Sequence, residues 1–152
     1  MKNHLLKIVI FVILILVVYL SPFKIIVVSG NSMFPTLKNK QILVGMATDK
    51  FDKNDVVVAY FEDNYIIKRI KYLEGDEYYY WLNNYSVLPV LVNKDFYEHF
   101  NKHNKTEMVF KSKIEKNKVY LLGDNPNNSD DSRRFGSLDK SSIKYKIIFP
   151  RF

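Results

Sequence analysis

Residues 55–73 read DVVVAYFEDNYIIKRIKYL. Residues 55–61 and 64–73 within this stretch are rich in β-branched and aromatic side chains, and a short polar segment separates them. This pattern predicts two antiparallel strands that form a β-hairpin. The glutamate-glycine-aspartate segment at residues 74–76 is typical of a turn that ends the second strand.

The rest of the chain continues the pattern of short apolar runs separated by turn residues. Many short strands of this kind favour a mainly β, antiparallel domain. Further strands are predicted at residues 24–28, 41–44, 118–122 and 143–149, with strand-like segments within 77–92 and a short helix within 94–104.

The composition is that of a globular protein. Of the 152 residues, 47% are hydrophobic and 26% are charged. The net charge is +7, but no arginine-rich or recognition-helix pattern accompanies it, so the sequence predicts no nucleic-acid partner. Attraction to anionic lipid head groups is the expected consequence of the positive charge. The absence of cysteine excludes thiol nucleophiles, zinc–thiolate sites and disulfides.

Residues 8–20 (IVIFVILILVVYL) form an unbroken apolar run. Counted from Leu5 to Phe23, the run approaches the roughly 20 residues that cross a hydrocarbon core, and it predicts a transmembrane helix. A cleavable secretory signal is the alternative, but no small-x-small cleavage pattern precedes Ser29. We therefore expect a cytoplasmic tip and anchor at residues 1–23 and one further domain at 24–152.

The charge around this run predicts its orientation. Lys2 and Lys7 favour a cytoplasmic N-terminus, and a long domain is translocated largely regardless of its own charge. The sequence therefore predicts a single-pass protein of the cell membrane with an extracytoplasmic domain.

The segment SGNSMFPTL, residues 29–37, follows the predicted anchor closely. Ser32 is a candidate nucleophile, but a serine needs a base, and none of the three histidines lies near a motif-like stretch. Lys68 is the better partner. It shares one strand face with Ile66 and Ile70, and burial among apolar side chains lowers the pKa of a lysine. From spacing alone, an ordinary turn at Ser32 and a half-exposed structural lysine remain the alternatives.

A third polar segment, GDNPNNSDDSRRFG, occupies residues 123–136. Taken alone, it is a loop with Asx turns, or a calcium site because its side chains are rich in oxygen. Its acids lack the alternate positions and the terminal glutamate of an EF-hand, so calcium is not predicted.

Together, the three segments resemble the conserved boxes of the bacterial type I signal peptidase family. The Ser-Met-x-Pro-Thr-Leu sequence that begins at Ser32 resembles its nucleophile box. Lys68, Arg69 and the downstream Gly-Asp at residues 75–76 resemble its lysine box, and residues 123–136 resemble its Gly-Asp-Asn…Ser-x-Asp-Ser-Arg-x-Phe-Gly box. The order and spacing agree from the anchor to the end of the third box.

This resemblance implies a fold and a reaction. The fold is a signal-peptidase-like antiparallel β domain, with residues 77–117 as a small inserted β subdomain. The reaction is the removal of N-terminal signal peptides from exported preproteins, after small residues at the first and third positions before the bond. It proceeds through an acyl-enzyme on Ser32 with Lys68 as general base, and it needs no metal or cofactor. Signal peptides and membrane lipid are the implied partners, and contact with the export machinery is left open.

The resemblance also implies supporting roles. Ser129 matches a serine that orients the lysine amine, and Asp131 with Arg133 matches a structural ion pair. Asp124 and Arg69 match a second ion pair. The nucleophile's own backbone N–H serves as oxyanion donor, and the residues adjacent to it are Gly30, Asn31 and Met33.

The chain departs from the family pattern at three points. Gly30 stands where some members carry an extra hydroxyl donor, and Pro126 stands where arginine is common. The lysine box also lacks the first glycine of Gly-x-x-Gly-Asp. These changes affect loop geometry and leave the nucleophile and base in place.

Two alternatives follow from the same residues. Self-cleaving SOS-repressor proteases share a similar serine/lysine core, but they lack a membrane anchor. A catalytically weak or silent homologue acting as a non-enzymatic export or assembly partner is the second alternative. Retention of Ser32, Lys68 and Ser129 argues against it.

Overall fold

The computed structural model describes residues 2–82, 88–103 and 109–151, and it confirms a mainly β, antiparallel fold. The larger of two sheets contains, in spatial order, β1 (Phe23–Val27), β2 (Ile42–Met46), β10 (Ile143–Phe149), β3 (Val56–Phe61), β4 (Asn64–Leu73), β8 (Lys118–Leu122) and β9 (Leu138–Asp139). The smaller sheet contains β6 (Val90–Val92), β5 (Glu77–Trp81) and β7 (Val109–Lys113).

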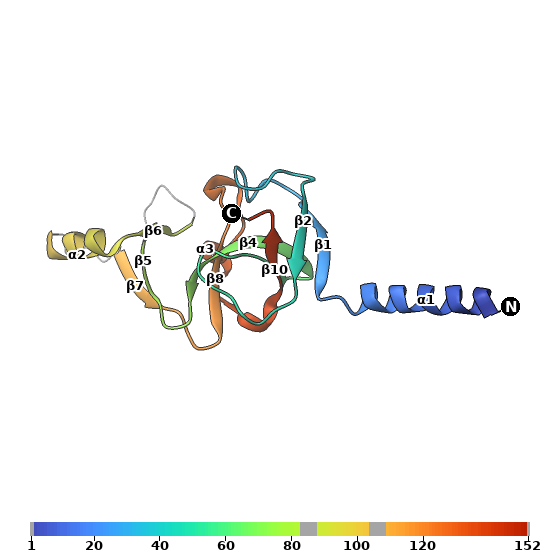
Figure 1. The fold of residues 1–152 in the computed structure, drawn as a ribbon. Coiled ribbons are helices and arrows are strands. Elements are labelled where there is room, and N and C mark those ends of the chain that lie inside the picture. Colours follow the sequence, from blue (N-terminus) through green and yellow to red (C-terminus); the bar gives the residue numbers. More distant parts are fainter. Residues whose placement is uncertain (1, 83–87, 104–108, 152) are drawn as a thin grey trace.

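The helices are few and lie mostly outside the larger sheet. They are α1 (Lys2–Tyr19), α2 (Lys94–His103) and α3 (Ser132–Phe135), with 3-10 turns at Pro126–Asn128 and Lys140–Ser142. Figure 1 shows α1 projecting from one side of the larger sheet, with the smaller sheet and α2 on the opposite side.

The predicted hairpin forms the centre of the larger sheet. β3 and β4 pair from Val56 opposite Arg69 to Phe61 opposite Asn64. Because side chains of a strand alternate between faces, β3 contributes to two separate apolar clusters. Val56 and Val58 pack in one cluster with Met33, Leu37, Leu43 and others, and Val57 and Ala59 pack in the second with Ile70, Val119 and Leu121. Residues 56–59 of β3 are therefore buried on both faces of the sheet.

Two short strands were not predicted from the sequence. β7 reads VFKSK, with lysines on its exposed positions, and it forms because β5 pairs with it along its whole length. β9 has only two residues and pairs with β8 at the sheet edge. The predicted segment at 77–92 includes residues 83–87, and the predicted helix at 94–104 includes residue 104. These residues lie outside the described residues.

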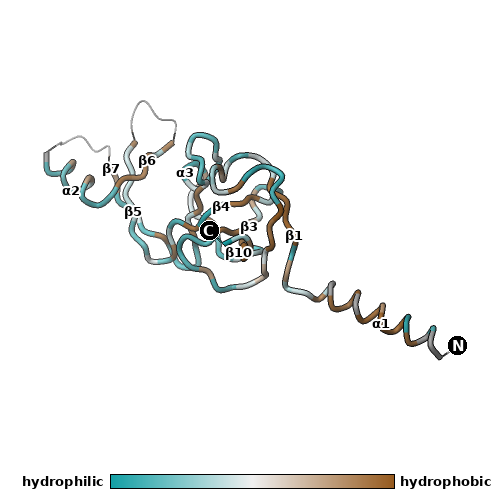
Figure 2. Tube along the Cα trace, turned by 45° about the horizontal axis from the view of Figure 1, so that its top comes forward, coloured by the Kyte–Doolittle hydropathy of each residue, from teal (hydrophilic) through white to brown (hydrophobic). Residues whose placement is uncertain are grey.

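A helix does form where the anchor was predicted. Figure 2 shows that α1 is hydrophobic over most of its length, and many of its apolar side chains are exposed, as at Phe11 (64%). Within the described parts of the chain, however, no helix has both the length and the apolar character needed to cross a membrane. The structure therefore does not confirm the predicted transmembrane helix.

Candidate active site

The turn after β1 holds the predicted nucleophile against the core. Met33 and Leu37 are 2% and 0% exposed, and the Leu37 N–H donates to the Met33 carbonyl at 2.8 Å. Ser32, next to the buried Met33, stays half-buried, so its hydroxyl is held in place and still reached from outside. Two buried side chains thus fix the backbone that carries Ser32.

Lys68 lies on β4 opposite Val57 and is only 4% exposed. Its Nζ lies 2.9 Å from Ser32 Oγ, a hydrogen bond between residues 36 positions apart in the chain. Burial lowers the pKa of Lys68 below its ordinary 10.5, and the carboxylates of Asp131 and Asp130 oppose that shift. A lysine amine with a lowered pKa is more often neutral and can then accept the proton of an adjacent hydroxyl.

Asp131 and Arg133 form a buried ion pair beside this contact. Asp131 is fully buried, and Arg133 donates to it through Nε at 2.9 Å and Nη2 at 2.8 Å. Burial raises the pKa of Asp131, but the hydrogen bonds from Arg133 and from the Gly123 N–H outweigh it, so the pKa is lowered overall. The carboxylate is therefore charged and already paired, which leaves Lys68 free of a direct ion pair with it.

Arg69 and Asp124 form the second predicted ion pair. Arg69 donates through Nε to Asp124 Oδ1 at 2.9 Å and through Nη2 to Oδ2 at 2.6 Å. This bidentate geometry fixes the orientation of both groups. Arg69 also donates to the Asn54 carbonyl at 2.8 Å, so it joins β4 to the segments that precede β3 and follow β8.

Comparison with known proteins shows the family of the chain. The signal peptidase, peptidase S26, family matches the chain over residues 1–152. The chain belongs to this family. It is similar to signal peptidase I S of Bacillus subtilis (35% identity over 145 residues, covering 83% of this chain and 76% of the relative). It is also similar to signal peptidase IB of Staphylococcus aureus (31% over 142 residues, covering 80% and 74%).

Among solved structures, the chain is similar to a crystal structure of a signal peptidase I from Enterococcus faecalis V583. The match has 20% identity and a TM-score of 0.41, and it covers 65% of this chain and 97% of that one.

Ser129, whose counterpart in type I signal peptidases was expected to orient the lysine, does not do so in this structure. Its side chain is buried, and within the described part of the chain Ser129 Oγ makes no hydrogen bond to Lys68. The Ser129 hydroxyl instead interacts with Asp131 and helps to lower the pKa of that carboxylate. The hydroxyl is thus placed among the site residues without the predicted bond to Lys68.

The residues around the nucleophile have separate roles. Gly30 has φ +89°, a conformation that favours glycine, and its N–H donates to Asn39 Oδ1 at 3.1 Å. The Asn31 carbonyl accepts a hydrogen bond from the Phe34 N–H at 3.1 Å. Met33 packs in the first apolar cluster. Pro126, where the signal peptidase pattern commonly has arginine, begins a 3-10 turn, and its carbonyl accepts from Arg133 Nη2 at 2.9 Å.

Sequence reasoning missed Gly123 and Asn125, although both belong to the Gly-Asp-Asn segment that carried the family resemblance. The Asn125 N–H donates to the Ser32 carbonyl at 2.9 Å, and Asn125 Nδ2 donates to the Asn31 carbonyl at 3.1 Å. A Cβ at Gly123 would clash with Ser129 Oγ and would lie 2.6 Å from the Ser32 carbonyl oxygen. The third box therefore contacts the nucleophile turn directly.

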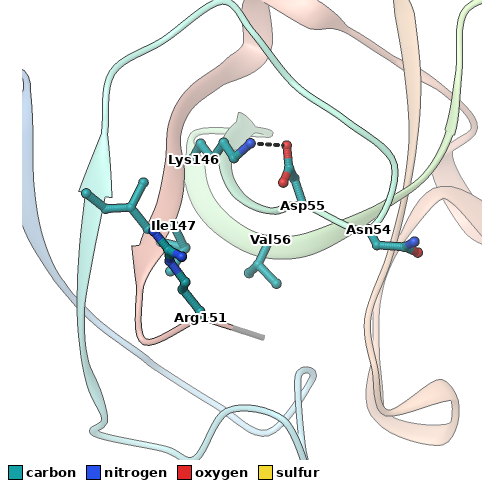
Figure 3. A pocket seen from close by; sticks show the side chains of 7 residues that line it. Asn54, Asp55, Val56, Lys146, Ile147 and Arg151 are labelled. Carbon is teal, nitrogen blue, oxygen red and sulfur yellow. Dashed lines mark ion pairs between the residues drawn. The ribbon is translucent and has the colours of Figure 1, made fainter.

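A small cleft of about 180 Å³ opens beside Ser32 and Lys68. Most of its lining is apolar and comes from the end of β1, from the Ser32 turn and from the β3–β4 hairpin, including Ile26, Val28, Met33, Val58 and Ile67. A separate hollow of about 350 Å³ lies near the ends of β3 and β10, where Lys146 pairs with Asp55 at 2.7 Å (Figure 3). The second hollow contains neither Ser32 nor Lys68.

We expect Gly123→Ala to lower kcat for a signal-peptide substrate by about 100-fold, the effect of a displacement of about 1 Å in a site of this kind. The added methyl group meets a backbone carbonyl that Asn125 already holds, so the Ser32 turn has to move. Kinetics and thermal unfolding of the purified variant test this. A folded variant with the wild-type kcat would contradict the tight contact.

Proposed function

We propose that this chain is a membrane-associated serine/lysine endopeptidase that removes N-terminal signal peptides from exported preproteins. The single observation that carries the proposal is the 2.9 Å contact between Lys68 Nζ and Ser32 Oγ, made by a lysine that is 4% exposed. Membership of the family, and relatives that are themselves signal peptidases, support the same conclusion.

The proposed reaction uses only groups of the chain and water. The neutral amine of Lys68 accepts the hydroxyl proton of Ser32 while Ser32 Oγ forms a bond to the scissile carbonyl carbon. The tetrahedral intermediate then expels the amine of the mature protein, which takes its proton from the Lys68 ammonium. This leaves the signal peptide as an ester on Ser32. Lys68 then deprotonates a water molecule, which hydrolyses the ester and frees Ser32.

The small cleft beside the dyad is the proposed site for the residues before the bond. Its mostly apolar lining suits an uncharged residue such as alanine better than a charged group. Asp131–Arg133 and Arg69–Asp124 act as structural supports in this proposal, because each carboxylate is already paired with its arginine.

The catalytic step is expected to depend on pH through Lys68. Only the neutral amine acts as base, so kcat should rise with pH through the apparent pKa of this group, and burial places that pKa below 10.5. A pH–rate profile of purified protein tests this. A rate that increases only above about pH 10 would mean that the lysine is not desolvated.

The proposal places the chain at a membrane, with a cytoplasmic N-terminus and residues 24–152 outside. Exposed apolar side chains along α1, continued by Ile25 (73%) and Val27 (59%) on β1, favour contact with lipid. The charge of Lys2 and Lys7 favours this orientation. A division into an anchor, a catalytic domain and a small subdomain at 77–117 belongs to the same proposal.

Protease added to intact, wall-stripped cells should digest the region after Phe23 and leave an N-terminal tag protected. The tag should be protected because the positive charge of Lys2 and Lys7 favours a cytoplasmic N-terminus. The tag should become accessible once the membrane is lysed. A tag that is digested in intact cells would reverse the proposed topology.

The general test of the proposed function is cleavage of a purified preprotein, with the new N-terminus identified by mass spectrometry. We expect a single cut after a small residue, at the end of the signal peptide. A folded, lipid-reconstituted protein that leaves several preproteins intact would instead favour the non-enzymatic partner.

A further inference from the structure

Asn125 makes two hydrogen bonds to the backbone on either side of the nucleophile. Its side-chain Nδ2 donates to the Asn31 carbonyl at 3.1 Å, and its backbone N–H donates to the Ser32 carbonyl at 2.9 Å. One residue from a loop more than 90 positions away thus holds two consecutive peptide groups of the Ser32 turn.

The first of these bonds has a consequence for the Ser32 N–H. The Asn31 carbonyl and the Ser32 N–H belong to one planar trans peptide and point in opposite directions. A donor that fixes the direction of the carbonyl therefore also fixes the direction of the N–H. Across the described ranges of the chain, this N–H donates to no protein acceptor.

A free backbone N–H on the residue that carries the attacking oxygen is suited to a developing negative charge. When Ser32 Oγ adds to the scissile carbonyl, the carbonyl electrons move to its oxygen, which becomes an anion close to Ser32. Donors aimed in advance at that oxygen stabilise the transition state, because they need no reorganisation during the reaction.

We propose that Asn125 is a positioning residue that aims the Ser32 N–H at this oxyanion. The inference rests on the proposed function, since it assigns the group that stabilises the intermediate of that reaction. Asn125 makes no hydrogen bond to the base within the described residues: Lys68 contacts Ser32 Oγ, whereas the two hydrogen bonds that Asn125 donates go to the Asn31 and Ser32 carbonyls. The Phe34 N–H also donates to the Asn31 carbonyl, so the turn keeps a local bond when the Asn125 side chain is removed.

A merely structural role for Asn125 would have different consequences. Asn125 is half-buried and belongs to neither apolar cluster, so its truncation leaves no cavity in the core. Asn125→Asp keeps the shape of the side chain but replaces the donor by an acceptor that repels the Asn31 carbonyl. Asn125→Ala removes the group. Both variants keep the backbone N–H that bonds to the Ser32 carbonyl.

The test compares wild type, Asn125→Asp, Asn125→Ala and the control Asn128→Ala in full-length, lipid-reconstituted protein. Asn128 is the same residue type in the same loop, and its side chain is exposed. Three quantities are measured: kcat and KM for a signal-peptide substrate, the pH midpoint of kcat, and the affinity for a peptide boronate, whose tetrahedral adduct with Ser32 resembles the intermediate.

We expect both Asn125 variants to lose about 10- to 100-fold in kcat. Boronate affinity should fall by a similar factor, while KM and the pH midpoint stay close to wild type. Asn128→Ala should behave as wild type. Three results with an active wild type would overturn this inference alone and leave the proposed function standing. The Asn125 variants could keep the wild-type kcat, lose activity through KM alone, or keep full boronate affinity. A wild type that neither cleaves the substrate nor binds the boronate would refute the proposed function, and this inference with it.

Discussion

Replacing Ser32 by alanine is expected to lower cleavage of a signal-peptide substrate by about 10⁴- to 10⁶-fold, the loss seen when the nucleophile of a serine protease is removed. Lys68 would then have no hydroxyl to deprotonate at 2.9 Å, and no acyl-enzyme would form. The measurement is turnover of purified protein, followed by mass spectrometry of the products.

Ser141→Ala is the matched control, because Ser141 is an exposed serine on the far 3-10 turn, Lys140–Ser142. Ser32 is half-buried and lies outside both apolar clusters, so the Ser32 variant should unfold at close to the wild-type temperature. Appreciable turnover by a folded Ser32→Ala protein would show that another residue is the nucleophile.

Replacing Lys68 by arginine is expected to lower kcat by about 10³-fold or more, nearly as much as Lys68→Met. Arginine keeps a positive charge but does not release its proton at any working pH, so it cannot act as a base. General-base catalysis contributes about 10²- to 10⁴-fold, and a guanidinium at this buried position also disturbs Ser32.

The two Lys68 variants should differ in stability. Lys68→Met removes a buried amine and is expected to fold well, whereas Lys68→Arg puts a larger, permanently charged group in a place that is 4% exposed. Lys71→Arg, an exposed lysine on the same strand, is the control and should keep its activity. A Lys68→Arg protein that cleaves at the wild-type rate would show that Lys68 is a structural cation and not the general base.

The sequence predicted the elements whose signal is local. The apolar runs at 55–61 and 64–73 needed only alternation and a turn, and the hairpin β3–β4 formed with the expected residues. The short strands β7 and β9 were missed because their own residues carry little signal. β7 contains two lysines among five residues, so its composition does not favour a strand. Its backbone pairing with β5 stabilises the strand instead.

At the site, too, local motifs could be predicted from the sequence, whereas contacts that depend on distant segments could not. The three boxes predicted a set of site residues, and the structure brings Ser32 to Lys68, Arg69 to Asp124 and Arg133 to Asp131. The expected bond from Ser129 to Lys68 is not formed, because a hydrogen bond depends on the rotation of a buried side chain, which no spacing encodes. Contacts of Gly123 and Asn125 with the Ser32 turn likewise depend on how a distant loop docks.

The most direct test of the serine/lysine account is to trap the acyl-enzyme. Wild-type protein is mixed with a signal-peptide substrate, quenched in acid after a fraction of a turnover, and analysed as an intact chain and after digestion. We predict a mass increase equal to the part of the substrate before the scissile bond, located on Ser32 and absent from Ser32→Ala. Full turnover without any adduct, or an adduct on another residue, would contradict the account.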